Sequence, residues 1–169
     1  TDYHIALKSA DIAMYEAKKA GRNCYKVFNE SMYHYSQQNF MIQQEFYDSL
    51  QNNDFYLHLQ PQVIISTGKL VGFEALVRRK HHELGNIYPD SFIPILDESD
   101  KIVQLGRWVA TNALAQLAEL SKYQDNLRMA INISPRQLYD ETFIPLLLEL
   151  CTLHKLKTQQ VEVELTEGI

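Results

Sequence analysis

Five polar side chains fall on predicted β-strands, and their types suit metal and phosphate chemistry. Glu74, Asn132 and Glu164 carry carboxylate or amide oxygens, whereas Gln60 and Arg78 can donate hydrogen bonds to an anion. Oxygen ligands without thiolate or paired histidine favour Mg²⁺ or Mn²⁺ over zinc. An arginine fork binds phosphate through two parallel charged hydrogen bonds. One interpretation is a site for a cation and a phosphate; the other is the solvated face of a sheet.

Glu74 and Arg78 lie four residues apart in one predicted strand. Side chains alternate between the faces of a strand, so these two share a face. The usual rise separates them by about 13 Å along the backbone. They could therefore hold the two ends of one ligand, with a metal at Glu74 and a phosphate at Arg78.

Alternating and helical patterns predict the elements that would position these side chains. In chain order they are strands at 55–62 and 71–78, helices at 92–98 and 102–120, a strand at 128–134, a helix at 135–154 and a strand at 161–166. The turn Thr67-Gly68-Lys69 predicts that the first two strands form an antiparallel hairpin. Strands then alternate with helices, which predicts parallel pairing through right-handed crossovers. Trp108 is expected to pack against the sheet.

A closed barrel is the predicted architecture, because parallel sheets are usually covered on both faces. The apolar faces of the strands suit the side under the helices: Val71, Phe73, Ala75, Val77, Met129, Ile131, Ile133, Val161, Val163 and Leu165. In a barrel the opposite face is the interior, and its polar groups gather at the C-terminal mouth. Carboxylates that meet there would repel one another without a cation, which favours the metal interpretation.

The first fifty residues follow a different pattern. Apolar spacing predicts a helix at 5–20 that Gly21 ends, and a short strand at 24–28. A second helix at 31–50, rich in Gln and Asn, could connect two domains. Both ends of the chain interrupt an expected element, so the sequence is expected to be a fragment.

Composition narrows the function class. The formal net charge of −5 over 169 residues argues against binding a nucleic-acid polymer, which needs a basic surface. No apolar run approaches the ~20 residues of a membrane helix, and no signal peptide opens the chain. Cys24 and Cys151 lack a CxxC pattern and are expected to be free thiols in a reducing compartment. We therefore predict a cytoplasmic protein or the cytoplasmic part of a membrane-bound sensor.

Ordered motifs in the second part of the chain resemble those of EAL domains, a family of bacterial cyclic-di-GMP phosphodiesterases. They are Gln60-Pro61, Gly72-Phe73-Glu74-Ala75-Leu76-Val77-Arg78, His81-His82-Glu83-Leu84-Gly85 with Phe92-Ile93-Pro94, Ala130-Ile131-Asn132-Ile133-Ser134-Pro135-Arg136-Gln137, and Glu164-Leu165-Thr166-Glu167. A Glu-Ala-Leu tripeptide alone would carry no information. The ordered set, over roughly residues 45–169, is highly specific.

The resemblance implies an α/β fold, the N-terminal half of a modified TIM barrel whose first strand is antiparallel to the rest. It also implies hydrolysis of cyclic-di-GMP to pGpG by a water activated on Mg²⁺ or Mn²⁺. The positions that match metal ligands are Glu74, which is also catalytic, Asn132 and Glu164. Those that match substrate contacts are Gln60 and Arg78, and Glu167 matches a residue that supports a loop beside the metals. An aspartate pair, a lysine and a further glutamate of the family would follow residue 169, so the fragment alone is expected to be inactive.

Two positions depart from the family pattern. The family often has tryptophan where this chain has Arg79, and proline where it has His82. Neither position matches a metal ligand, so altered loop packing is expected and not loss of chemistry.

The N-terminal part resembles the end of a GGDEF domain, the diguanylate cyclase family, through Ala10-Asp11, Ala13-Met14-Tyr15, Ala17-Lys18 and Gly21-Arg22-Asn23. The resemblances together predict the end of a GGDEF domain at 1–28, a connecting helix at 29–50 and the first half of an EAL domain at 51–169. Lys18 and Arg22 match positions that approach a nucleotide triphosphate. The cyclase signature itself is absent, so no cyclisation chemistry is argued.

Two other functions stay open at this point. A catalytically degenerate EAL domain would act as a cyclic-di-GMP receptor, and a structural interaction module would neither bind nor hydrolyse the nucleotide. Half a barrel would also expose two sheet edges, which attract other strands. We therefore expect either that a second copy of the chain covers the exposed face as a homodimer, or that this face is highly disordered.

Overall fold

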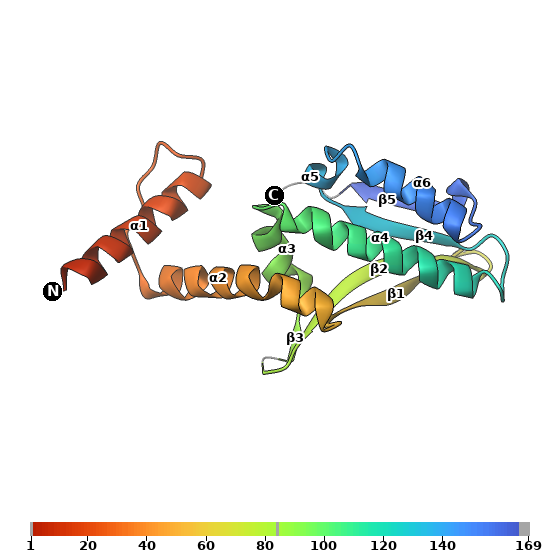
Figure 1. Ribbon diagram of the computed structural model, residues 1–169, viewed down its shortest axis with the longest axis horizontal. Helices are drawn as coiled ribbons and strands as arrows, with labels where there is room; N and C mark the ends of the chain where they lie inside the picture. The colour runs from red at the N-terminus through yellow and green to blue at the C-terminus, as the bar shows by residue number, and fades with distance from the viewer. Residues whose placement is uncertain (1, 84, 166–169) are drawn as a thin grey trace. The chain divides into compact units, whose positions relative to one another are not determined.

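The chain forms two compact units, residues 1–46 and 47–169 (Figure 1). The computed structural model describes residues 2–83 and 85–165. The first unit contains α1 (Tyr3–Lys19) and most of α2 (Glu30–Gln51). The second contains β1 (Phe55–Val63), β2 (Leu70–His81), β3 (Gly85–Ile87), α3 (Pro89–Asp97), α4 (Lys101–Leu120), β4 (Arg128–Ile133), α5 (Pro135–Leu138), α6 (Phe143–Leu153), the 3₁₀ turn η1 (Thr158–Gln160) and β5 (Val161–Leu165).

Both helices of the first unit begin at side-chain caps. The Asp2 carboxylate accepts from the His4 backbone N–H, and Asn29 Oδ1 accepts from the Met32 N–H at 2.9 Å, which satisfies free donors at each helix start. The helices predicted at 5–20 and 31–50 are therefore confirmed. The strand predicted at 24–28 is wrong: these residues join no sheet, and Tyr25 is 86% exposed. A strand is stabilised by its neighbours, and no strand among residues 2–83 and 85–165 pairs with this run.

The described residues of the second unit form a five-stranded sheet in the order β1-β2-β4-β5, with β3 beside β2. The β1–β2 hairpin is antiparallel, as predicted, whereas β2–β4 and β4–β5 are parallel. Parallel neighbours need a long crossover, and α3 with α4 supplies the first and α6 the second. The sheet therefore has mixed strand orientation, with its one antiparallel long strand at the start.

Helix α4 is the main cover of this sheet. It contacts β1, β2 and β4, and Figure 1 shows it running in front of them. Its buried residues recur at helical spacing: Ile102, Leu105, Gly106, Val109, Ala110, Ala113, Leu114 and Leu117. Trp108 lies against Phe55 of β1, with ring centroids 6.0 Å apart, which confirms that it packs on the sheet.

Three details of this unit differ from the prediction. The helix expected at 135–154 is two helices, because the Asp140 side chain accepts from the Thr142 backbone N–H and the local turn replaces helical bonding. Strand β3 was not predicted; it pairs with the end of β2. Val163 and Leu165 of β5 are 40% and 55% exposed, not covered, because β5 lies at the edge of the described sheet.

Candidate functional site

The strand register places the five predicted site residues on one face of the sheet. Gln60 of β1 pairs with Glu74 of β2, and Asn132 of β4 pairs with Glu164 of β5. Glu74 in turn pairs with Ala130, two residues before Asn132. Paired residues point to the same side, and so do residues two apart along a strand. Arg78, four residues after Glu74, shares that side.

Glu74 and Asn132 are in direct contact across β2 and β4. The Asn132 amide Nδ2 donates to Glu74 Oε1 at 2.7 Å, and both side chains are partly buried. The parallel register causes this contact, because it offsets Asn132 from Glu74 by one same-face step. Two residues that lie 58 positions apart in sequence thus share one point on the sheet.

Glu164 lies next to Asn132 on the neighbouring strand and is exposed. Glu162, two residues earlier, forms an ion pair with Arg128. Glu167 lies outside the described residues. The strands therefore bring Glu74 and Asn132 together and place Glu164 beside them.

The two predicted substrate contacts lie on the hairpin. Gln60 is exposed, and Arg78 is half-buried, with Nη1 donating to the Val77 carbonyl at 2.8 Å. Arg78 pairs with Tyr56 of β1. One arm of its guanidinium is thus held by the backbone, which reduces the conformations it must lose when an anion binds.

Of the two departures from the family pattern, Arg79 has a different environment from the loop that was expected, whereas His82 lies in a turn. Arg79 lies within β2, not in a loop, and is only 1% exposed. Its Nη2 donates to Ser49 Oγ at 2.8 Å, and its guanidinium lies 5.9 Å from the Phe55 ring. A planar guanidinium can replace an aromatic ring here because it stacks on another ring while Nη2 donates to Ser49. His82 is in the turn after β2, and its ring stacks on that of His81 with the ring centroids 4.4 Å apart.

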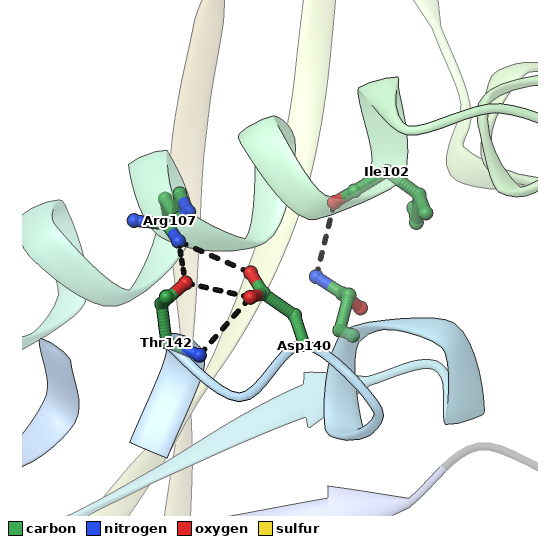
Figure 2. Close-up of polar contacts among 5 residues, drawn as sticks. Ile102, Arg107, Asp140 and Thr142 are labelled. Atoms are coloured by element: carbon green, nitrogen blue, oxygen red, sulfur yellow. Dashed lines mark hydrogen bonds and ion pairs between the residues drawn. The ribbon is translucent and has the colours of Figure 1, made fainter. Parts of the chain in front are cut away.

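Arg107, Asp140 and Thr142 form a polar cluster that joins α4 to the turn between α5 and α6 (Figure 2). Thr142 Oγ1 and its backbone N–H donate to Asp140 Oδ1 at 2.6 and 3.0 Å, and Arg107 Nη2 donates to Asp140 Oδ2 at 3.1 Å. Arg107 also contacts Thr142 Oγ1. The hydrogen bonds from Thr142, together with Arg107, lower the pKa of Asp140 from its ordinary 3.8. Sequence reasoning missed this cluster, because Arg107 lies 33 residues before Asp140.

The lowered pKa predicts how acid affects stability. Below about pH 4 the Asp140 carboxyl binds a proton in the unfolded chain but is still ionised in the folded protein. The contribution of Asp140 to stability is therefore fully present above that pH and is lost as the pH falls through the folded pKa. The stability difference between wild type and Asp140→Asn should be constant near neutral pH and shrink below about pH 4. Urea unfolding from pH 7 to pH 3 measures it. A difference that does not change with pH would rule out the ionised cluster.

The described residues form a concave region away from the predicted site residues, but it is unsuited to the predicted chemistry. A hollow of about 710 Å³ lies among the end of α4, the turn after α6 and Gln160, and no predicted site residue lines it. It is at the start of β4, whereas active sites of α/β barrels lie at the carboxyl ends of strands. Nor do the described residues contain a group of three or more His, Cys, Asp or Glu that could hold a metal; the predicted set combines two carboxylates with an amide.

Among the helices of the described residues, none combines the length and apolar character that a membrane span requires.

The chain matches a known domain family and is similar to known phosphodiesterases. The sequence model of the EAL domain family matches residues 43–169. "Cyclic di-GMP phosphodiesterase PdeR" of Escherichia coli is 36% identical over 99% of this chain and 25% of its own length. "Bifunctional diguanylate cyclase/cyclic di-GMP phosphodiesterase MucR" of Pseudomonas aeruginosa is 32% identical over 98% of this chain and 24% of its length. The chain therefore spans about a quarter of these relatives.

Solved structures agree with the family match. The phosphodiesterase PaMucR in complex with c-di-GMP superposes with a TM-score of 0.71 at 27% identity, covering 76% of this chain and 52% of that chain. The EAL enzyme Bd1971, bound to cAMP and cyclic-di-GMP, gives 0.70 at 30% identity, covering 78% and 38%. The mixed sheet and its covering helices are thus the α/β arrangement of EAL structures. On the family match to residues 43–169, this chain belongs to the EAL domain family.

Proposed function

We propose that the intact protein hydrolyses cyclic-di-GMP to pGpG with Mg²⁺ or Mn²⁺. The observation that carries the proposal is the 2.7 Å contact between Glu74 and Asn132, with Glu164 on the adjacent strand. The related PdeR and MucR are named as cyclic-di-GMP phosphodiesterases, and PaMucR was solved with the nucleotide. In this proposal the sheet continues into a modified TIM barrel, and the polar face becomes its mouth.

The donor set fits a hard cation. Glu74 and Glu164 offer carboxylate oxygens, and the Asn132 amide already points at Glu74. A half-turn of that amide would direct Oδ1 instead of Nδ2 to the same point, beside the Glu74 carboxylate, with Glu164 on the adjacent strand. Such all-oxygen sites suit Mg²⁺ and Mn²⁺. When bound, the metal would lower the pKa of a water molecule and polarise the phosphoryl oxygens.

The hairpin residues supply the binding half of the proposed site. Arg78 would pair with a phosphate through its guanidinium, and Gln60 would hydrogen-bond the nucleotide beside Glu74. Their strands are antiparallel neighbours, so Gln60 faces Glu74 directly while Arg78 lies further along β2. We propose that Glu167 steadies a loop next to these groups, as the resemblance implies.

The assay requires the intact protein, because the resemblance places further catalytic residues after residue 169 and we expect the 169-residue chain alone to be inactive. Purified protein incubated with cyclic-di-GMP and Mg²⁺ or Mn²⁺ should produce pGpG, and chelation with EDTA should stop the reaction. Calorimetry on the same sample separates the other outcomes. Binding without pGpG would make the protein a cyclic-di-GMP receptor, and neither binding nor turnover would leave an interaction module.

We propose that residues 1–28 are the end of a GGDEF domain and residues 29–50 a connecting helix. The similarity to MucR, a named diguanylate cyclase as well as phosphodiesterase, covers 98% of this chain and so includes its first part, which supports this division. The family match begins at residue 43, so it leaves residues 1–42 outside the EAL domain but includes 43–50, the end of the proposed connecting helix. The predictions of a homodimer and of a cytoplasmic location rest on the sequence alone. Sedimentation of the intact protein would test the homodimer.

A further inference from the structure

Gln137 is a buried amide that bridges the end of β4 to helix α4. The residue is 3% exposed. Its Oε1 accepts from the Ser134 backbone N–H at 2.6 Å, and its Nε2 donates to the Ile102 carbonyl at 3.1 Å, the bond drawn to Ile102 in Figure 2. A buried amide whose oxygen and nitrogen both have partners has one favoured orientation. The chain leaving β4 is therefore held at a fixed position on α4.

Gly106 of α4 makes room for this amide. A Cβ atom at position 106 would lie 1.7 Å from Gln137 Nε2 and 2.8 Å from its Cδ. Any larger residue at 106 would therefore displace the Gln137 amide from its place. A glycine in the middle of a 20-residue helix is otherwise unfavourable, so its absent side chain matters here for packing.

The bridge lies two residues from the proposed metal ligand on β4. Ser134 follows Asn132 by two positions, and Asn132 contacts Glu74 at 2.7 Å. We propose that Gln137, seated against Gly106, is a positioning residue that holds Asn132 at the distance from Glu74 that metal binding needs. The inference rests on the proposed function. Residues that support metal ligands typically change metal affinity or activity by about 10–100-fold when removed.

Gln160 of η1 provides a matched control, because it contacts the backbone at the other end of β4. Gln160 Nε2 donates to the Leu127 carbonyl at 3.0 Å and to Ser121 Oγ at 3.4 Å, just before β4 begins. Gln160→Ala removes the same kind of amide-to-backbone bond, but far along β4 from Asn132. Comparing the two alanine variants separates positioning of the ligand from general support of the strand.

The experiment measures Mn²⁺ binding to the intact protein by electron paramagnetic resonance without nucleotide, and then kcat and KM for cyclic-di-GMP. Gln137→Ala should weaken Mn²⁺ binding about 10–100-fold and lower kcat at limiting metal, with activity recovering in excess metal. KM should stay near the wild-type value, because Gln60 and Arg78 lie on other strands. Gln160→Ala should bind Mn²⁺ like wild type.

A double-mutant cycle keeps the test valid if a single variant is poorly folded. Gly106→Ala should lower the thermal midpoint and weaken Mn²⁺ binding when Gln137 is present. In the Gln137→Ala background the added methyl enters vacated space, so Gly106→Ala should have little further effect. Equal effects of Gly106→Ala in both backgrounds would overturn the pairing.

Two results would overturn the positioning role in different ways. In the first, the wild-type protein binds Mn²⁺, and Gln137→Ala either leaves this binding unchanged or weakens it no more than Gln160→Ala does. This result rules out the role of Gln137 alone. A wild-type protein that neither binds Mn²⁺ nor hydrolyses cyclic-di-GMP removes the proposed function and this inference together.

Discussion

Replacing Glu74 with alanine in the intact protein should lower the rate of cyclic-di-GMP hydrolysis by at least about a hundredfold. Glu74 is the carboxylate at which two strands of the site meet, since Asn132 donates to it at 2.7 Å. Its loss would remove a metal ligand, and polarisation by the metal stabilises the transition state by several kcal/mol. Each loss of about 1.36 kcal/mol lowers the rate tenfold. Production of pGpG at saturating Mn²⁺, with the fold checked by circular dichroism, is the measurement.

Glu162→Gln is the matched control for this experiment. Glu162 points to the same face from β5, but its carboxylate is paired with Arg128 at the surface and has no proposed metal role. Its replacement should leave turnover close to wild type, because exposed ion pairs contribute little. If Glu74→Ala retained turnover, or if both variants lost it equally, the metal assignment of Glu74 would be wrong.

Residue alternation was sufficient to predict which side chains share a face. Within β2, Glu74 and Arg78 are an even number of residues apart, and strand geometry then leaves no choice. The hairpin was predictable as well, because Thr67-Gly68-Lys69 marks a turn between two alternating runs and short connections favour antiparallel pairing. The common face of Gln60 and Glu74 follows from that pairing.

Contacts between distant strands could not be predicted in the same way. The contact of Asn132 with Glu74 depends on the register of β2 against β4, which the packing of α4 and both strands decides together. The Gln137–Gly106 pairing is equally non-local, and neither residue type is unusual in its own segment. Motif order from the family resemblance was the signal that identified Asn132. Gln137 ends the same motif, but the resemblance gave it no role, because it acts through contacts with the backbone and with α4.

Arg79 illustrates a different limit. Its position continues the apolar face of β2, yet a charged residue is buried there. Charge normally predicts exposure, because burying an unpaired ion is unfavourable. Here the stem and guanidinium lie over Phe55, and Ser49 accepts from one of the nitrogens. These partners come from β1 and the end of α2, so the environment of Arg79 follows from tertiary packing and not from its own segment.

Gly72→Ala should destabilise the sheet domain strongly for a change of one methyl group. Gly72 is buried and pairs with Arg128 of β4, and a Cβ built on it would lie 2.5 Å from the Arg128 carbonyl oxygen and 3.0 Å from its carbonyl carbon. These are backbone atoms, so no side-chain rotation can relieve the clash, and β2 must move away from β4. Overpacking of this kind lowers the free energy of unfolding by about 1–3 kcal/mol.

Urea unfolding of the 169-residue chain, followed by the fluorescence of its single tryptophan, measures this change, because Trp108 lies against Phe55 in the sheet domain. Lys69→Ala is the control: the residue is exposed in the same hairpin, and such surface changes usually stay within about 0.5 kcal/mol. In other strands alanine is no worse than glycine, since glycine has the greater entropy to lose. A Gly72→Ala chain as stable as wild type would therefore mean that β2 and β4 do not approach at Gly72 and Arg128, and the register that brings Glu74 to Asn132 would have to be abandoned.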